Sequence, residues 1–153
     1  MSTRRLDSSQ LAGPGRILVA VYAVLAVAAT GRSVFQIIDR FGEAPIAFSL
    51  SALAAVVYIV ATLALALRWT TIAWVTIGFE FVGVLVIGTV SVLAPGLLGL
   101  DSVDPFGREA TVWSAYGAGY LCIPLVLPVI GLFYLWRGRR VTAAESAAVE
   151  SAP

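Results

Sequence analysis

The hydrophobic pattern divides the chain into four long apolar segments. They cover residues 17–38, 46–67, 72–93 and 112–136, and shorter, more polar stretches separate them. Each segment is long enough to cross a hydrocarbon core of ~30 Å, which takes roughly 20 residues of α-helix. The segments are also longer and more uniformly apolar than the strands of a membrane barrel, which alternate over about ten residues. The pattern therefore predicts an all-α integral membrane protein whose four transmembrane helices form an up-down-up-down bundle.

The same pattern predicts how the rest of the chain is organised. We expect residues 1–16 to form a cytoplasmic N-terminal segment and residues 17–136 to form the transmembrane domain. Residues 137–153 are expected to be a disordered cytoplasmic tail, because this stretch is rich in Ala, Ser and Glu. The first apolar segment has some features of a cleaved signal peptide, but its length and the spans that follow favour an uncleaved anchor. Pro124 and Pro128 predict a bend in the fourth helix near one of them.

The arginine residues predict the orientation of the chain in the membrane. A chain that crosses the membrane four times has both termini on the same side. Seven arginines then lie on that side and two on the opposite side. The two are Arg40 and Arg108, and the seven are Arg4, Arg5, Arg16, Arg68, Arg137, Arg139 and Arg140. By the positive-inside rule, both termini are expected to be cytoplasmic, with the chain in the cell (plasma or inner) membrane.

The composition excludes several classes of function. Hydrophobic residues make up 59% of the 153 residues and charged residues only 12%, against roughly a quarter charged in a soluble domain. The net charge of +1 predicts no nucleic-acid partner. The chain has no His and a single Cys, Cys122, so the usual general base, most zinc sites and paired-cysteine redox sites are excluded. We therefore expect a protein that is not an enzyme, with no catalytic residue, no metal site and no cofactor.

Four polar side chains inside the apolar segments are the candidate functional residues. Arg32 and Gln36 lie in the first segment, Tyr58 in the second and Glu80 in the third. An ionisable group at the centre of a membrane helix costs about 2.5–3.5 kcal/mol on insertion scales, so such groups are candidates for function. Residues 68–71 join the second and third segments in a tight helical hairpin. Positions 58 and 80 are equally far from residue 69 in this turn, so they lie opposite each other across the hairpin. We therefore predict a hydrogen bond from the Tyr58 hydroxyl to Glu80.

The sequence leaves two interpretations open for each charged residue. Arg32 shares a helix face with Gln36 and Asp39, so it can pair with Asp39 or reach the outer headgroups. Alternatively it pairs with Glu80, which requires closing about 10 Å along the membrane normal. Glu80 is either a protonated acid that hydrogen-bonds a neighbouring helix or a carboxyl that exchanges a proton in a carrier.

Three stretches of the chain carry a resemblance to a known family. Residues 29–37 read ATGRSVFQI, residues 44–62 read APIAFSLSALAAVVYIVAT and residues 112–120 read VWSAYGAGY. They resemble the small four-span integral membrane proteins of actinobacteria, and the similarity covers roughly residues 16–136. The resemblance implies the four-span architecture and brings no activity, ligand or site residue with it.

Two functions fit these observations. The first is a non-catalytic accessory or assembly subunit, in which Arg32, Gln36, Tyr58 and Glu80 serve helix packing or docking to a larger membrane partner. The second is a small oligomeric transporter in which Glu80 binds a proton or a cation. The expected partners are the lipid bilayer and either a larger membrane complex or further copies of the chain.

Overall fold

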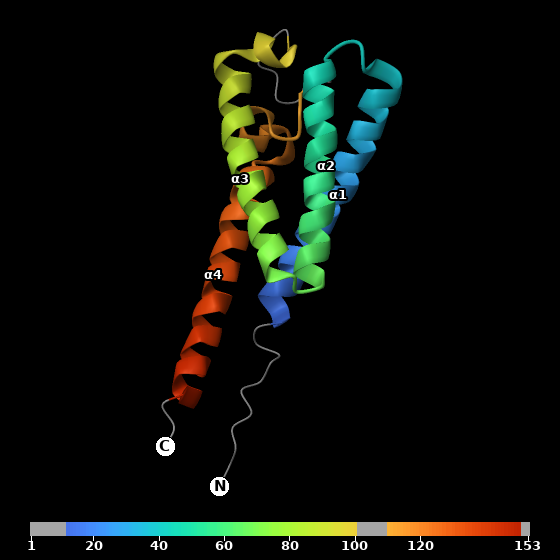
Figure 1. Ribbon diagram of the computed structural model, residues 1–153. Coiled ribbons are helices and arrows are strands. Elements are labelled where there is room, and N and C mark those ends of the chain that lie inside the picture. The colour runs from blue at the N-terminus through green and yellow to red at the C-terminus, as the bar shows by residue number, and fades with distance from the viewer. Residues whose placement is uncertain (1–11, 101–109, 151–153) are drawn as a thin grey trace.

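The computed structural model describes residues 12–100 and 110–150, with side chains for residues 13–100 and 110–140. Within these ranges the fold is entirely helical, which confirms the predicted fold class. Figure 1 shows long helices packed side by side, with short helical turns at one end of the bundle. The long helices are α1 (Ala12–Arg40), α2 (Pro45–Ala66), α3 (Thr70–Leu93) and α4 (Ile123–Glu150), and the short 3₁₀ helices are η1 (Pro95–Leu98) and η2 (Ser114–Tyr120).

The helices have the length and composition of membrane spans. α1, α2 and α3 are each long and apolar enough to cross a bilayer, and η2 with α4 would make a fourth crossing if the bent pair counts as one span. The protein is therefore a multi-pass membrane protein. The first helix is longer than the predicted 17–38 at both ends, while the second and third agree with prediction to within two residues.

The predicted hairpin between the second and third spans is present. α2 ends at Ala66, and Arg68 adopts a left-handed conformation with φ of 58°. The main-chain N–H of Trp69 then donates to the carbonyl of Ala64 and that of Arg68 to the carbonyl of Leu65, at 2.8 and 3.3 Å. This pattern is a Schellman motif, which satisfies the last carbonyls of a helix and reverses the chain.

The fourth span differs from the prediction of one helix over residues 112–136. α4 begins only at Ile123, and residues 110–122 before it form an irregular segment containing η2, whose axis makes an angle of 98° with α4. Positive φ values at Leu121 and Cys122 break the helix there. Pro128 lies inside α4 and Pro124 in its first turn, where proline starts a helix because that turn needs no N–H donor. The expected bend at one of these prolines is therefore replaced by a break ahead of both.

The irregular segment fills the space that half a helix would occupy. In Figure 1, α4 starts about halfway along α3, and the segment that precedes it lies against the upper half of α3. We call residues 110–122 the re-entrant segment. It lies beside the half of α3 that ends at Leu93, and α4 begins directly after it.

The predicted disordered tail is also wrong over residues 137–150, because α4 continues to Glu150. Residues 141–150 contain no Gly or Pro and are rich in Ala and Glu, which favour helix, so a helix already nucleated in the membrane can propagate through them. Residues 1–11, 101–109 and 151–153 lie outside the described part of the chain, and so do the expectations that concern Arg4, Arg5 and Arg108.

The helices pack unequally around the core. α1 packs along α2 through buried alanines such as Ala26, Ala29, Ala54 and Ala61, which allow the two backbones to approach closely. α3 contacts α2, the re-entrant segment and α4, whereas α1 and α4 scarcely touch. The bundle is therefore open between its first and last helices.

Candidate functional site

Glu80 lies at the centre of the core face of α3. The buried residues of this helix recur every three or four positions, which is the spacing of one helical face, and they are Ala73, Ile77, Glu80, Val84, Gly88 and Ser91. Helix periodicity therefore turns the carboxyl inward, and its exposed fraction is 0%. The only acidic residue of the third span thus faces neighbouring helices of the same chain and is shielded from lipid.

The hydrogen-bond donor to Glu80 is Tyr22 of α1. The Tyr22 hydroxyl donates to Oε2 of Glu80 over 2.7 Å, and both side chains are fully buried. Tyr22 is ten residues from the start of α1, and Glu80 is ten residues from the start of α3. At 1.5 Å per residue, both lie about 15 Å from the same end of the bundle. The bond links α1 to α3 across the core.

The predicted hydrogen bond from Tyr58 to Glu80 is wrong. The Tyr58 hydroxyl instead accepts a hydrogen bond from the indole Nε1 of Trp113, at 3.1 Å. The hairpin geometry does bring Tyr58 into the same cluster, where its ring lies 6.3 Å from that of Tyr22. The prediction failed because it considered only the two helices of the hairpin, while α1 and the re-entrant segment supply the actual partners.

Trp113 closes the cluster from the re-entrant segment. Only 1% of its surface is exposed, and its ring meets Phe79 edge to face, with the two ring centroids 6.4 Å apart. The ring also lies against Gly83, where a Cβ atom would come within 2.9 Å of it. We call Tyr22, Tyr58, Glu80 and Trp113 the Glu80 cluster, since they join α1, α2, α3 and the re-entrant segment at one point.

The two oxygens of the Glu80 carboxyl differ in their hydrogen bonds, and only Oε2 accepts one from a described residue. Oε1 is buried and has no hydrogen-bond partner among the residues that the structure describes. Over the same residues, no three His, Cys, Asp or Glu side chains lie close enough together to hold a metal ion. A lone acceptor oxygen is suited to a proton, because a cation that sheds its water needs several oxygen ligands.

Arg32 and Gln36 form a separate site near the other end of α1. The Arg32 guanidinium donates to the main-chain carbonyl of Ala110 over 2.7 Å, and Nε2 of Gln36 donates to the same carbonyl over 3.4 Å. Arg32 lies ten residues, or about 15 Å, from Tyr22 along α1, so it does not pair with Glu80. Among the described side chains, no ion pair joins Arg32 to Asp39. Arg32 and Gln36 share a helix face as expected, and together they fix the start of the re-entrant segment.

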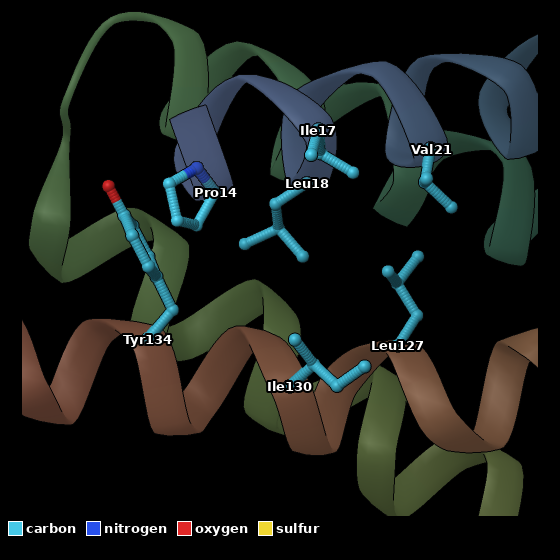
Figure 2. A pocket seen from close by; sticks show the side chains of 7 residues that line it. All are labelled: Pro14, Ile17, Leu18, Val21, Leu127, Ile130 and Tyr134. Carbon is cyan, nitrogen blue, oxygen red and sulfur yellow. The ribbon is translucent and has the colours of Figure 1, made fainter. Parts of the chain in front are cut away.

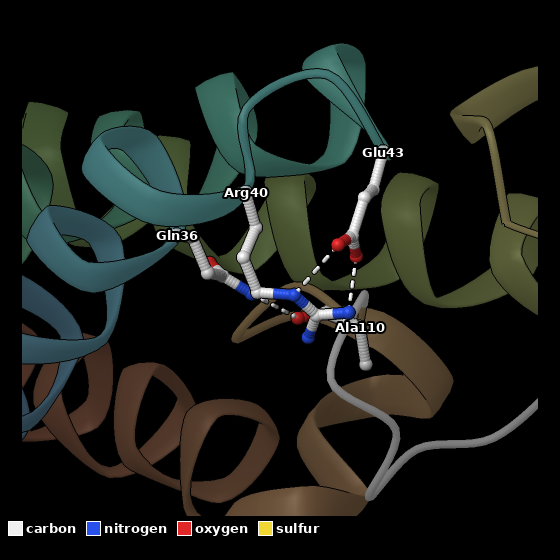
Figure 3. Close-up of polar contacts among 4 residues, drawn as sticks. All are labelled: Gln36, Arg40, Glu43 and Ala110. Carbon is white, nitrogen blue, oxygen red and sulfur yellow. Dashed lines mark hydrogen bonds and ion pairs between the residues drawn. The ribbon is translucent and has the colours of Figure 1, made fainter.

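An ion pair lies next to this site. Arg40, the last residue of α1, bonds Glu43 through two guanidinium nitrogens, one of them Nε at 2.9 Å from Oε1. Figure 3 shows this pair beside the bond from Gln36 to Ala110. Both residues of the pair are reached by solvent, and exposed pairs of this kind contribute little to stability.

Hydroxyl groups hold the re-entrant segment against α3. The Ser91 hydroxyl accepts a hydrogen bond from the main-chain N–H of Ala115 at 2.8 Å, and the hydroxyls of Thr89 and Tyr116 lie 3.0 Å apart. Ala115 and Tyr116 have positive φ values of 46° and 60°. Such values are unfavourable for residues with a side chain, so outside contacts are needed to hold this backbone.

These contacts make Ser91→Ala a test of the segment's anchoring. The substitution leaves the N–H of Ala115 without its partner in a partly buried place, and we expect it to lower the free energy of unfolding by about 1 kcal/mol. The measurement is unfolding of the purified protein in mixed micelles. Ser51→Ala is the matched control, because the Ser51 hydroxyl is fully buried with no hydrogen-bond partner among the described residues. Equal losses in the two variants would contradict the anchoring role of Ser91.

The structure thus assigns the four candidate residues to two places. Tyr58 and Glu80 meet in the Glu80 cluster, and Arg32 and Gln36 meet at Ala110. Tyr22 and Trp113 were missed. The sequence feature that could have identified them is a polar group inside a membrane span, since a Tyr hydroxyl or a Trp N–H there needs a buried partner. Each of the two is the first such group in its apolar segment.

Comparison of the chain with protein-family models, with curated proteins and with solved structures finds no match. The resemblance to the actinobacterial four-span proteins therefore stays a prediction.

Proposed function

We propose that the chain is a non-catalytic accessory or assembly subunit that packs against a larger membrane partner. The observation that carries this proposal is the enclosure of Glu80, whose carboxyl is fully buried and bonded to Tyr22 of the same chain. A carboxyl in such a place joins helices of one subunit. The role of the Glu80 cluster in this proposal is to hold the shape of the surface that the partner meets.

The other buried polar groups support the same role. Arg32, Ser91 and Thr89 all bond the re-entrant segment, so they too connect parts of one chain. The faces of α1, α2 and α3 that point away from the core expose large apolar side chains, among them Val27, Val56 and Val82. Such faces suit lipid and the apolar surface of another membrane protein alike.

We also propose that the end of the bundle where α1 begins faces the cytoplasm. Arg16, Arg68 and Arg137 lie at this end, and Arg40 lies at the opposite end. This arrangement follows the positive-inside rule. Reporter fusions after residues 153 and 42 should be active on opposite sides of the membrane.

The accessory role is tested by purifying the tagged protein from its own cells in mild detergent. We expect one larger membrane protein to co-purify in stoichiometric amount, and to do so equally with the Glu80→Gln variant, because the amide can still accept the Tyr22 hydrogen bond. Tyr22→Phe, which removes the donor, should weaken the recovery. Recovery of the chain only as itself, in both the parent and the variants, would overturn the accessory role.

Two observations favour proton-coupled transport as a second candidate. Oε1 of Glu80 is a buried acceptor with no partner among the described residues. The fourth span is broken at Leu121 and Cys122, and broken helices near the middle of the membrane line the binding sites of many transporters. A proton on Oε1 leaves Oε2 free to accept the Tyr22 hydroxyl.

Proton flux into liposomes distinguishes the two candidates. The purified protein is reconstituted, a potassium diffusion potential is applied with valinomycin, and internal pH is followed with a trapped dye. Under the accessory role, liposomes with the parent protein and with Glu80→Gln should acidify no faster than empty liposomes. Flux by the parent that is lost in Glu80→Gln, with the variant still folded, would favour transport.

A further inference from the structure

The buried polar side chains gather in one half of the bundle. We call the half that holds the end of α1, the start of α2 and the end of α3 the upper half, as drawn in Figure 1, and the other the lower half. The buried polar side chains of the described residues are Ser33, Gln36, Ser51, Glu80, Ser91, Thr111 and Ser114. All of them except Glu80 lie in the upper half, whereas buried positions of the lower half are mostly aliphatic, such as Leu18, Ala61 and Ile77. The core therefore changes from apolar to polar at the level of the Glu80 cluster.

Two serine hydroxyls in the upper half have no hydrogen-bond partner among the described residues. Ser33 on α1 is 4% exposed, and Ser51 on α2 is fully buried. They lie at about the same depth, since Ser33 is seven residues before the end of α1 and Ser51 six residues after the start of α2. A hydroxyl without a partner in a protein interior is unfavourable. Water that reached the upper half would supply that partner.

The re-entrant segment enters the upper half and turns back. The ring of Trp113 lies against Gly83, which is ten residues, or about 15 Å, from the end of α3. Two residues later, the main-chain N–H of Ala115 bonds Ser91, which is only two residues, or about 3 Å, from the same end. The segment therefore reaches down to the Glu80 cluster and returns, which is the geometry of a plug.

The backbone of this plug is unfavourable without its contacts. Ala115, Tyr116, Leu121 and Cys122 all have positive φ values, between 46° and 60°. The same residues belong to an uncharged apolar run that continues to Trp136, and such a run favours regular helix in a membrane. Release of the segment costs its hydrogen bonds to α1 and α3 and the packing of its indole ring, but it relieves the strained backbone. These opposing contributions make the segment a candidate two-state element.

The lower half offers no comparable polar route to Glu80. Figure 2 shows the side chains that line the groove between α1 and α4 there, and Tyr134 carries the only polar side-chain group among them. A Cβ atom on Gly131 of α4 would lie 3.2 Å from Ile77 and 3.5 Å from the Tyr22 hydroxyl, so α4 covers the cluster closely. Among the described residues, polar side chains therefore lead to the cluster from the upper half.

We propose that the upper half of the bundle is a vestibule for water, which the re-entrant segment plugs and opens by reversible release. In the released state, water bonds the hydroxyls of Ser33, Ser51 and Ser91 and reaches the Glu80 cluster. This inference does not rest on the accessory role. It supplies the route to Glu80 that the transport candidate needs. Because it concerns the position of one segment, it can fail or hold whatever the co-purification and flux measurements give.

Thiol accessibility in lipid nanodiscs tests whether water enters the upper half. Cys122→Ala gives a cysteine-free background, and the probe is sulfonatoethyl methanethiosulfonate, a charged reagent that does not enter lipid. Ser51→Cys and Ala61→Cys are the matched pair, because both positions are fully buried on α2 and lie six and five residues from its upper and lower ends. We expect Ser51→Cys to react at least about tenfold faster, because the reactive thiolate forms where water reaches the sulfur. Equal rates would overturn the vestibule, and Ser33→Cys repeats the comparison from α1 if Ser51→Cys does not fold.

The plug is tested by weakening its anchor in the same assay. Ser91→Ala removes the hydrogen bond to Ala115, and at low reagent concentration the labelling rate follows the population of the released state. We expect Ser51→Cys to be labelled about fivefold faster in this background, the factor that corresponds to a loss of about 1 kcal/mol. Thr76→Ala is the control and should leave the rate unchanged, because the Thr76 hydroxyl bonds carbonyls of its own helix. An unchanged rate with Ser91→Ala, or an equal acceleration at Ala61→Cys, which indicates global unfolding, would overturn the plug.

Discussion

Replacing Trp113 with Ala is expected to lower the free energy of unfolding by about 3–5 kcal/mol, the cost of truncating a large buried aromatic side chain. Trp113 is 1% exposed, packs against Gly83 and Phe79, and donates to the Tyr58 hydroxyl. The substitution leaves a cavity at the point where α3 and the re-entrant segment meet. Unfolding of the purified protein in mixed micelles, followed by circular dichroism, measures the loss.

Two further variants separate the contributions of the indole. Trp113→Phe keeps most of the ring but removes Nε1, so it should cost less than the Ala variant. Trp69→Ala is the control, because Trp69 is 52% exposed next to the α2–α3 turn, and we expect it to change the unfolding free energy by less than about 1 kcal/mol. If Trp69→Ala destabilised the protein as much as Trp113→Ala, the central position of Trp113 would be contradicted.

Replacing Gly88 with Val is the second large effect, with an expected loss of about 3 kcal/mol from overpacking. A Cβ atom at Gly88 would lie 2.6 Å from Cδ1 and 2.9 Å from the main-chain nitrogen of Tyr116. The ring can swing away, but the main-chain nitrogen cannot move without shifting the re-entrant segment. We therefore expect this variant to release the segment from α3, which increased proteolysis at residues 110–122 would report.

Gly78→Val provides the matched control on the same helix. A Cβ atom at Gly78 meets nothing within 4 Å, so added methyl groups point into open space. The two variants make the same chemical change in α3 and differ only in what lies opposite. A similar loss of stability in both would mean that helix propensity decides the outcome and that the close approach of Tyr116 does not.

The Glu80 cluster shows how far reasoning from the sequence reached. The short turn at residues 68–71 and the equal spacing of positions 58 and 80 from it were enough to place Glu80 and Tyr58 at the same depth, and the structure has both fully buried. The partner atoms could not be deduced, because Tyr22 is separated from Glu80 by 58 positions and the predicted start of α1 was five residues late. At 1.5 Å per residue that error moved Tyr22 by about 7 Å along the helix.

The fourth apolar segment shows a feature that the hydrophobic pattern could not predict. Its hydropathy is continuous across residues 112–136, so a pattern that measures only apolar character predicts one helix. The break depends on positive φ values at Leu121 and Cys122. It also depends on a hydrogen bond that Ser91 accepts and one that Arg32 donates, and both of these residues lie on other helices. A backbone conformation that is unfavourable by itself persists only where tertiary contacts hold it.

The sequence by itself determined that the chain is helical, that most of it is apolar enough to lie in a membrane, and that a short turn joins the second and third spans. These properties follow from the length and period of apolar runs, since lipid offers no partner to an unpaired backbone group. Only the tertiary structure decided that Tyr22 binds Glu80, that the last span is broken, and that α1 and α4 stand apart. Each of these depends on contacts between segments distant in the chain, whose relative depths and distances the order of residues does not contain.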